Sequence, residues 1–252
     1  MRETGGLGRM AVEGLFQATA WGEVWAAHRG NRPLQLMTKP VAVPLLGLKA
    51  ALRRGTLEPA QTRLLVSGLL AAGVGDYYMS RSDEDGQIVR GAAAFGAMQT
   101  LYSALLLRRG HRPHLRTAAL PAALWAAAAT LLAVRREPGR GAVPAVLASY
   151  AAVLAGTLTL AQDPGPADAP GPVTRLIRPG RDRRTWLPAG VALFAISDTA
   201  ILLRRTLLTG ARSRAAAQVF VLVSYNAAQW LIVEGFLAPP GRDGGSPTPH
   251  IR

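Results

Sequence analysis

Two aspartates lie inside long apolar segments of this sequence, where a carboxylate is unusual. Asp76 falls within LLVSGLLAAGVGDYYM and Asp198 within WLPAGVALFAISDTAILL. A carboxylate at membrane depth costs about 3 to 10 kcal/mol unless it is paired, protonated or open to a polar cavity. Asp76 and Asp198 are therefore the candidate functional residues of the chain.

Lys39 is a third ionisable residue in an apolar segment, and Pro40 and Pro44 follow it. The prolines predict a broken hydrogen-bond ladder, which membranes tolerate mainly where the backbone lines a cavity or is buried in protein. If the segments cross a membrane alternately, Lys39 and Asp76 lie at similar depth, with Asp198 nearby. An ion pair with Lys39 would favour the charged form of one aspartate, whereas an unpaired aspartate would hold a proton. One carboxyl as acid and one as base is the arrangement that acid/base hydrolysis requires.

Several uncharged polar residues recur at helical spacing near these positions. Gln99 and Tyr102 lie three residues apart, and Tyr225 and Gln229 lie four apart, so each pair occupies one helix face. Ser197 directly precedes Asp198. Hydrogen bonding between membrane helices explains each of them equally well when it is taken alone.

Positioning these residues requires a bundle of helices. The apolar residues make up 49% of the chain and gather in eight segments of about 17 to 24 residues, close to the length that crosses about 30 Å of hydrocarbon. We therefore predict an all-α fold, a polytopic bundle of about eight transmembrane helices. The segments are residues 10–28, 36–52, 62–79, 88–108, 117–134, 143–161, 186–203 and 215–237.

The predicted domain organisation is simple. Residues 1–9 form a polar N-terminal segment, residues 10–237 one transmembrane domain with a Pro/Gly-rich loop at 162–185, and residues 238–252 a disordered tail. A separation of 122 residues between Asp76 and Asp198, and of 123 between Tyr102 and Tyr225, indicates two parallel four-helix halves. A chance match in an Ala- and Leu-rich sequence is the alternative.

The net charge of +14 comes almost entirely from arginines in short loops. Such arginines are typical of topology signals and of contacts with anionic headgroups, so nucleic acid is not the expected partner. Their excess on the side of the N-terminus predicts that both termini are cytoplasmic in a bacterial cell membrane. The four histidines all fall in loops or the tail, so we expect no intramembrane metal site. Glu234, at the end of the last segment, is expected at the membrane interface.

Five short motifs, in order along nearly the whole chain, resemble the YhhN-like lysoplasmalogenase family. The family usually has His three residues before the tyrosine of the fourth segment, where this chain has Gln99. The motifs are Lys39-Pro40, Gly75-Asp76, the segment from Phe95 to Tyr102, Leu193-Phe194-Ala195-Ile196-Ser197-Asp198, and Tyr225-Asn226-Ala227-Ala228-Gln229.

The resemblance implies hydrolysis of the vinyl-ether bond of lysoplasmalogens to an aldehyde and a glycerophospho-base, with no metal or organic cofactor. Asp76 and Asp198 would be the acid/base pair, and Lys39 would tune an aspartate or contact phosphate. Gln99, Tyr102, Ser197, Tyr225 and Gln229 would orient the substrate or water. The expected partners are a lysolipid substrate and membrane lipids, and the sequence leaves the oligomeric state open. A proton-coupled or small-solute transporter and a non-catalytic lipid-binding protein are the alternatives.

Overall fold

The computed structural model describes residues 4–53, 55–82, 84–134, 142–163 and 183–238, and all regular structure in these residues is helical. The predicted all-α class is therefore confirmed. Eight long helices and one short 3₁₀ helix are present in the described ranges. They are α1 (Thr4–His28), α2 (Arg32–Leu52), α3 (Pro59–Arg81), α4 (Asp85–Arg108), α5 (Leu115–Val134), α6 (Val143–Ala161), η1 (Arg183–Thr185), α8 (Trp186–Thr206) and α9 (Ala211–Phe236).

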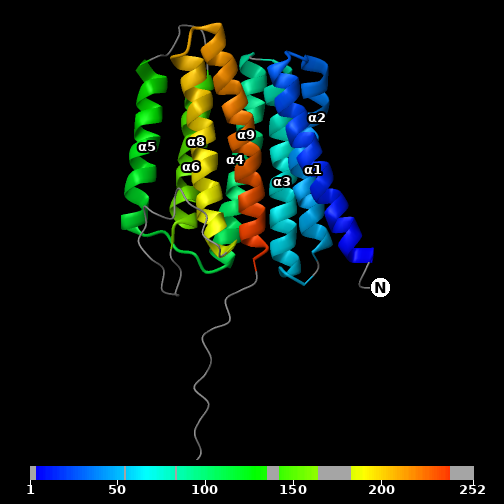
Figure 1. Ribbon diagram of the computed structural model, residues 1–252. Coiled ribbons are helices and arrows are strands. Elements are labelled where there is room, and N and C mark those ends of the chain that lie inside the picture. Colours follow the sequence, from blue (N-terminus) through cyan, green and yellow to red (C-terminus); the bar gives the residue numbers. More distant parts are fainter. Residues whose placement is uncertain (1–3, 54, 83, 135–141, 164–182, 239–252) are drawn as a thin grey trace, which may run out of the picture.

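The long helices stand side by side and alternate in direction, so both ends of the described chain lie at the lower end of the bundle (Figure 1). Consecutive helices pack together from α1 to α4, and α5 packs against α6. Helix α9 closes the bundle by contacting α8, α1 and α2. Segments far apart in the sequence therefore meet in the interior.

The eight helices coincide with the eight predicted apolar segments, with differences at the ends. Helix α1 begins at Thr4, inside the segment predicted to be polar. Helix α6 ends at Ala161 and η1 begins at Arg183, and residues 164–182 and 239–252 lie outside the described residues. The loop and the disordered tail therefore remain predictions.

Helix α2 is continuous through both of its prolines, so they interrupt its hydrogen-bond ladder without ending the helix. A proline inside a helix removes one backbone donor without ending the helix when neighbouring helices hold the backbone in place. Pro44 lacks the N–H that would bond the Pro40 carbonyl, and that carbonyl lies against Gly73 of α3. The lost hydrogen bond thus lies at a helix contact.

Four of the described helices, α5, α6, α8 and α9, are long and apolar enough to cross a membrane. The prediction of eight such helices is therefore supported for the second half of the chain only. The first four helices carry more charge, including Glu13 and Glu23 on α1 and Lys39 and Lys49 on α2.

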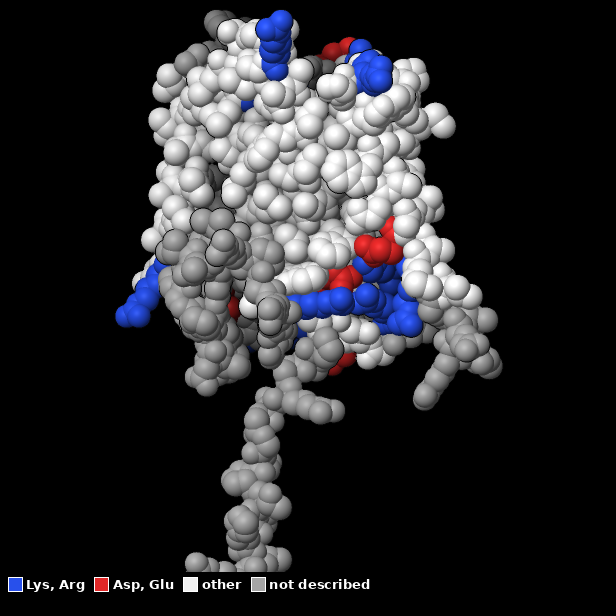
Figure 2. Space-filling view, viewed as in Figure 1, with Lys and Arg blue, Asp and Glu red and all other residues white. Residues whose placement is uncertain are grey.

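A cluster of charged side chains joins α1, α2 and α9 at their lower ends. Lys49 is only 3% exposed and forms ion pairs with Glu13 and, at 2.7 Å, with Glu234. Arg53 and Arg183 reach the Glu234 carboxylate at 3.5 and 3.0 Å. Figure 2 shows acidic and basic side chains gathered in this part of the surface, below a broad band of uncharged residues. Glu234, predicted at the membrane interface, lies near the end of α9 and is buried beside these three cations.

The loop between α4 and α5 is fastened to the end of α6. Asp163 accepts a hydrogen bond from the backbone N–H of Arg112 at 2.5 Å and lies 3.2 Å from His114 Nε2. His111 donates from Nδ1 to the Leu160 carbonyl at 3.1 Å. This loop contact holds α5 and α6 together at the lower end of the bundle.

We predict that Lys49→Met destabilises the fold, because it leaves Glu234 and Glu13 without their buried cation. Breaking a buried ion pair costs about 3 to 5 kcal/mol, which corresponds to a fall of about 5 °C or more in the melting temperature. Thermal unfolding in detergent measures the effect. Arg63→Met, at an exposed position on α3, is the control and should melt like the wild type. Equal melting temperatures for both variants would contradict the structural role of Lys49.

A second prediction concerns acidification. Burial lowers the pKa of His111 below its ordinary value of 6.5, against the opposing effects of the Leu160 carbonyl and Asp163. The unfolded chain then binds a proton more readily than the folded one, so the stability contributed by His111 is complete above pH 6.5 and is lost as the pH falls.

The stability advantage of the wild type over His111→Gln should therefore shrink between about pH 8 and pH 5. Thermal unfolding across this range measures the difference, and the same comparison with His28→Gln, at an exposed position, is the control. A constant advantage at every pH would contradict the assignment.

Candidate functional site

A cavity of about 170 Å³ opens among the upper halves of the helices. Its polar part is lined by Lys39, Asp76, Tyr150, Asp198 and Tyr225, which come from five different helices. The rest of its wall is largely apolar and extends down α5 and α6. The structure thus brings the two predicted aspartates and the predicted lysine to one cavity, as their expected depths required.

Asp76 is 1% exposed and is held from two sides. The Tyr225 hydroxyl of α9 donates a hydrogen bond to Asp76 Oδ2 at 2.7 Å. Lys39 Nζ of α2 lies 3.8 Å from Asp76 Oδ1, which makes a long ion pair. The predicted ion pair between Lys39 and an aspartate is therefore present, and Asp76 is its partner.

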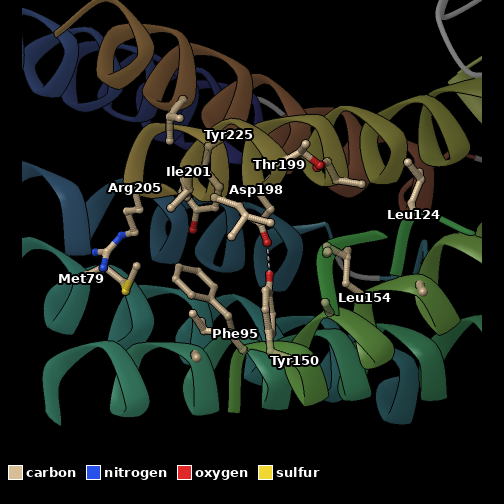
Figure 3. A pocket seen from close by; sticks show the side chains of 18 of the residues that line it. Met79, Phe95, Leu124, Tyr150, Leu154, Asp198, Thr199, Ile201, Arg205 and Tyr225 are labelled. Carbon is tan, nitrogen blue, oxygen red and sulfur yellow. Dashed lines mark hydrogen bonds between the residues drawn. The ribbon is translucent and has the colours of Figure 1, made fainter. Parts of the chain in front are cut away.

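Asp198 has a tyrosine partner as well. The Tyr150 hydroxyl of α6 donates to Asp198 Oδ2, and Figure 3 shows the two side chains pointing toward each other. Asp198 also interacts electrostatically with Lys39. Sequence reasoning missed Tyr150, although it is the one tyrosine in the apolar segment of α6 and could have been noticed on that ground.

Two glycines next to Asp76 set the spacing of the helices around it. A Cβ on Gly73 would lie 2.6 Å from the Pro44 ring of α2, and a Cβ on Gly75 would lie 2.9 Å from the Phe95 ring of α4. Only glycine permits such close helix contacts. The absence of side chains at 73 and 75 therefore brings α2 and α4 close enough for Lys39 and Phe95 to share the cavity with Asp76.

The other predicted orienting residues lie outside the cavity lining. The Tyr102 hydroxyl donates to Gln229 Oε1 at 2.9 Å, and both side chains are buried between α4 and α9. The Ser197 hydroxyl donates to the Val221 carbonyl at 3.1 Å. These contacts are hydrogen bonds between helices, the alternative role that the sequence left open for these residues. Of the residues predicted to orient the substrate or water, only Lys39 and Tyr225 line the cavity.

Gln99 is buried on α4 beside Tyr150. Neither its Nε2 nor its Oε1 forms a hydrogen bond within the described residues. The side chain at this position is therefore placed to influence the tyrosine that holds Asp198, without touching the carboxylate itself.

A third buried carboxyl group was not singled out from the sequence. Glu23 of α1 is 1% exposed and accepts a hydrogen bond from Asn226 Nδ2 at 3.2 Å. It interacts electrostatically with Lys39 and with Asp76. Glu13 and Glu23 both lie in the first apolar segment, and both have partners in the bundle.

Comparison with known proteins gives one positive result. No curated protein and no solved structure matches the chain. The sequence model of the YhhN family matches residues 34–236, which include all of the helices from α3 to α9 and both cavity aspartates. The chain therefore belongs to the YhhN family.

Proposed function

We propose that the protein is an integral-membrane hydrolase that cleaves the vinyl-ether bond of lysoplasmalogens or related ether lysolipids. The observation that carries the proposal is the pair of aspartates, each bonded to a tyrosine hydroxyl, that faces one largely apolar cavity. Membership of the YhhN family supports it. Such a cavity accommodates a lipid chain and supplies two carboxyl groups at one point along it.

All eight long helices cross the membrane in this proposal. The charges that make α1 to α3 less apolar face inward: Glu23, Lys49 and Asp76 are each at most 3% exposed. The outward residues of the same helices include large apolar side chains, such as Trp21 and Met37, which are 62% and 71% exposed. Apolar residues facing outward and charged residues facing inward are typical of a lipid-embedded bundle.

The position of the cavity opening favours one orientation of a bound single-chain lipid. Helix α5 packs against α6, whereas α8 packs against α9 and α6, so α5 and α8 face each other across the cavity. Leu124 and Trp125 line it while remaining 47% and 40% exposed, which indicates an opening toward the lipid. A chain entering there lies along α5 and α6.

The headgroup would then lie toward the upper end. Arg205 also lines the cavity and is about 10 Å beyond Asp198 at the rise of an α-helix. Its guanidinium matches a phosphate in charge and geometry. The vinyl ether, between the chain and the glycerol, falls beside the carboxyl groups.

The chemistry requires one carboxylic acid and one carboxylate. The acid protonates the outer alkene carbon; the C=C electron pair forms the new C–H bond and leaves an oxocarbenium ion, which the carboxylate stabilises. Water adds to this cation as a carboxylate takes one of its protons. The hemiacetal then collapses: its hydroxyl proton goes to a carboxylate, the C–O bond to glycerol breaks, and the glycerol oxygen takes a proton from the carboxylic acid, which releases the aldehyde. Glycosidases divide the same tasks between two carboxyl groups. Asp76 and Asp198 fill these roles, without a metal or organic cofactor.

Gln99 stands where the family usually has histidine. An amide cannot transfer a proton, so in this proposal the carboxyl groups carry the proton transfers. The proposed location is a bacterial cell membrane with both termini cytoplasmic, which places the carboxyl groups in the outer half. The parallel duplication stays a prediction: Asp76 and Asp198 occupy α3 and α8, but their tyrosine partners lie on α9 and α6.

The purified protein should release a fatty aldehyde from lysoplasmalogen, measured by mass spectrometry. Asp76→Asn and Asp198→Asn should each lower turnover by about 100-fold or more, because general acid/base groups contribute about 10² to 10⁴. Glu58→Gln, an exposed carboxyl at the start of α3, is the matched control and should retain activity.

The outcomes distinguish the proposal from its alternatives. No aldehyde at any pH from the wild type would contradict hydrolysis, and flux of a solute into proteoliposomes without conversion would identify a transporter. Binding of lysolipid without either result would identify a non-catalytic relative. Full activity in both aspartate variants would contradict the site.

A neighbouring pair of alanines tests the path of the lipid chain. Ala128 of α5 lines the cavity, whereas Ala127 is exposed and lies outside its lining. Ala128→Phe should raise KM for a long-chain lysolipid by about tenfold, the effect of about 1.4 kcal/mol in binding, and leave a short-chain vinyl ether unaffected. Ala127→Phe should change neither substrate. Equal effects of the two variants would contradict a chain lying along α5.

A further inference from the structure

A second cavity of about 170 Å³ lies between α1 and α9, and none of the described residues lines both it and the cavity of the two aspartates. Trp21 and Val223 line it while remaining 62% and 40% exposed, so it opens as a groove on the outside of the bundle. Its apolar wall comes from one face of each helix: Phe16, Ala20 and Val24 of α1, and Val223, Ala227 and Trp230 of α9. The groove therefore follows α1 for eight residues, or about 12 Å at the rise of a helix.

The lower end of this groove meets the charge cluster, which comprises Glu13, Lys49, Arg53, Arg183 and Glu234. Trp230 lines the groove and donates from Nε1 to Glu13 Oε1 at 2.6 Å, and Lys49 Nζ lies 5.8 Å from the centre of a Trp230 ring. The Trp186 ring lies 5.2 Å from Trp230, between ring centroids, and 5.5 Å from the Arg183 guanidinium. Two neighbouring indole rings thus connect the apolar groove to the cations.

The charge cluster presents positive charge at the surface. Its described members are three cations and two carboxylates, which leaves a formal charge of +1. Arg183 donates from Nη1 to Glu234 Oε2 at 3.0 Å, and its side chain is still 53% exposed. Arg53 adds a second guanidinium, 3.5 Å from Glu234 and 23% exposed. A guanidinium has five N–H donors, so the outward donors of these arginines can bind a further anion.

The level of the charge cluster favours a lipid over a soluble anion. Its side chains lie at the lower border of the broad uncharged band (Figure 2), which is the level at which headgroups meet the hydrocarbon of a bilayer. The groove runs from the charge cluster into that band, so an acyl chain in the groove and a phosphate at the arginines belong to one molecule. A phosphate matches a guanidinium in charge and geometry. The excess positive charge favours a headgroup that is negative overall.

We propose that the groove and the charge cluster together bind one anionic phospholipid, with its phosphate at Arg53 and Arg183 and one acyl chain between α1 and α9. This lipid is a bound partner and not the substrate, because Val221 and Tyr225, which line the cavity of the aspartates, lie on a different face of α9 from Ala227 and Trp230. It fills the space between the first and the last helix of the bundle. The proposal goes beyond the proposed function and requires only its membrane location.

Titration of the purified full-length protein in detergent with phosphatidylglycerol, followed by native mass spectrometry, tests the proposal. One phosphatidylglycerol should bind per chain, and phosphatidylcholine with the same acyl chains should bind more weakly. Arg53→Gln and Arg183→Gln should each weaken phosphatidylglycerol binding by about fivefold, the effect of one basic side chain near an anionic headgroup. Arg63→Gln is the matched control, because Arg63 is exposed near the lower end of α3, outside the charge cluster, and it should bind like the wild type.

A pair of alanines tests the groove itself. Ala227 lines the groove, whereas Ala18 of α1 is exposed and lies outside its lining. Ala227→Phe should weaken phosphatidylglycerol binding by about tenfold, the loss of roughly two buried methylene groups, and Ala18→Phe should leave it unchanged. The water-soluble headgroup glycerophosphoglycerol, which has no acyl chain, should not displace the bound lipid.

Unchanged phosphatidylglycerol binding in a folded Arg183→Gln protein overturns the proposal, and this half-exposed position decides the result if Arg53→Gln fails to fold. Displacement by glycerophosphoglycerol also overturns it, because the site then binds an anion without the groove. A lipid-free dimer that Ala227→Phe separates would assign the groove to a second copy of the chain. Absence of aldehyde from the wild type would overturn the proposed function alone, because the lipid titration measures no turnover.

Discussion

The ion pair between Lys39 and Asp76 is the interaction around which the rest of the bundle is arranged. Two charges inside apolar helices are costly, and they persist only where geometry and further hydrogen bonds compensate for lost hydration. The compensation comes from four helices: Tyr225 on α9 bonds the carboxylate, and Gly73 and Gly75 let α2 and α4 approach α3. Because α9 is the last helix and α2 the second, the contacts on Asp76 join segments from both halves of the chain.

The two ends of the bundle use buried charge in different ways. At the lower end, Lys49 meets Glu13 and Glu234, and Arg53 and Arg183 add positive charge, so both of these carboxylates have a close cation. In the upper half, the ammonium of Lys39 lies 3.8 Å from Asp76, and the hydrogen-bond partners of Asp198 and Glu23 are a tyrosine and an asparagine. The first arrangement suits stability. The second leaves carboxyl groups short of positive charge beside a cavity, which is the condition under which protons are bound and released at a functional site.

A bundle of this kind also explains how a lipid could reach buried carboxyl groups. Helix α5 is bound to α6 by packing and by the hydrogen bond from Trp125 Nε1 to the Ala148 carbonyl at 3.0 Å, and it leaves the side toward α8 open. The polar groups stay covered by α1 to α4 and α9 on the opposite side. Under the proposed function, the lipid chain would remain among apolar residues while its vinyl-ether bond lies beside Asp76 and Asp198.

The sequence by itself determined the helices, their number and the candidate carboxyl groups, because apolar segments of membrane length and an aspartate inside each of two of them are local features. It also predicted that Lys39 pairs with an aspartate, since alternating helices fix depth, and the structure shows that the partner is Asp76. It could not decide which side of a helix faces which neighbour. Tyr150, Glu23 and the buried state of Glu234 came only from the tertiary structure, and so did the positions of Tyr102, Ser197 and Gln229 away from the cavity. Depth follows from position along one helix, whereas contact depends on how all the helices rotate and pack, and that is settled by long-range interactions.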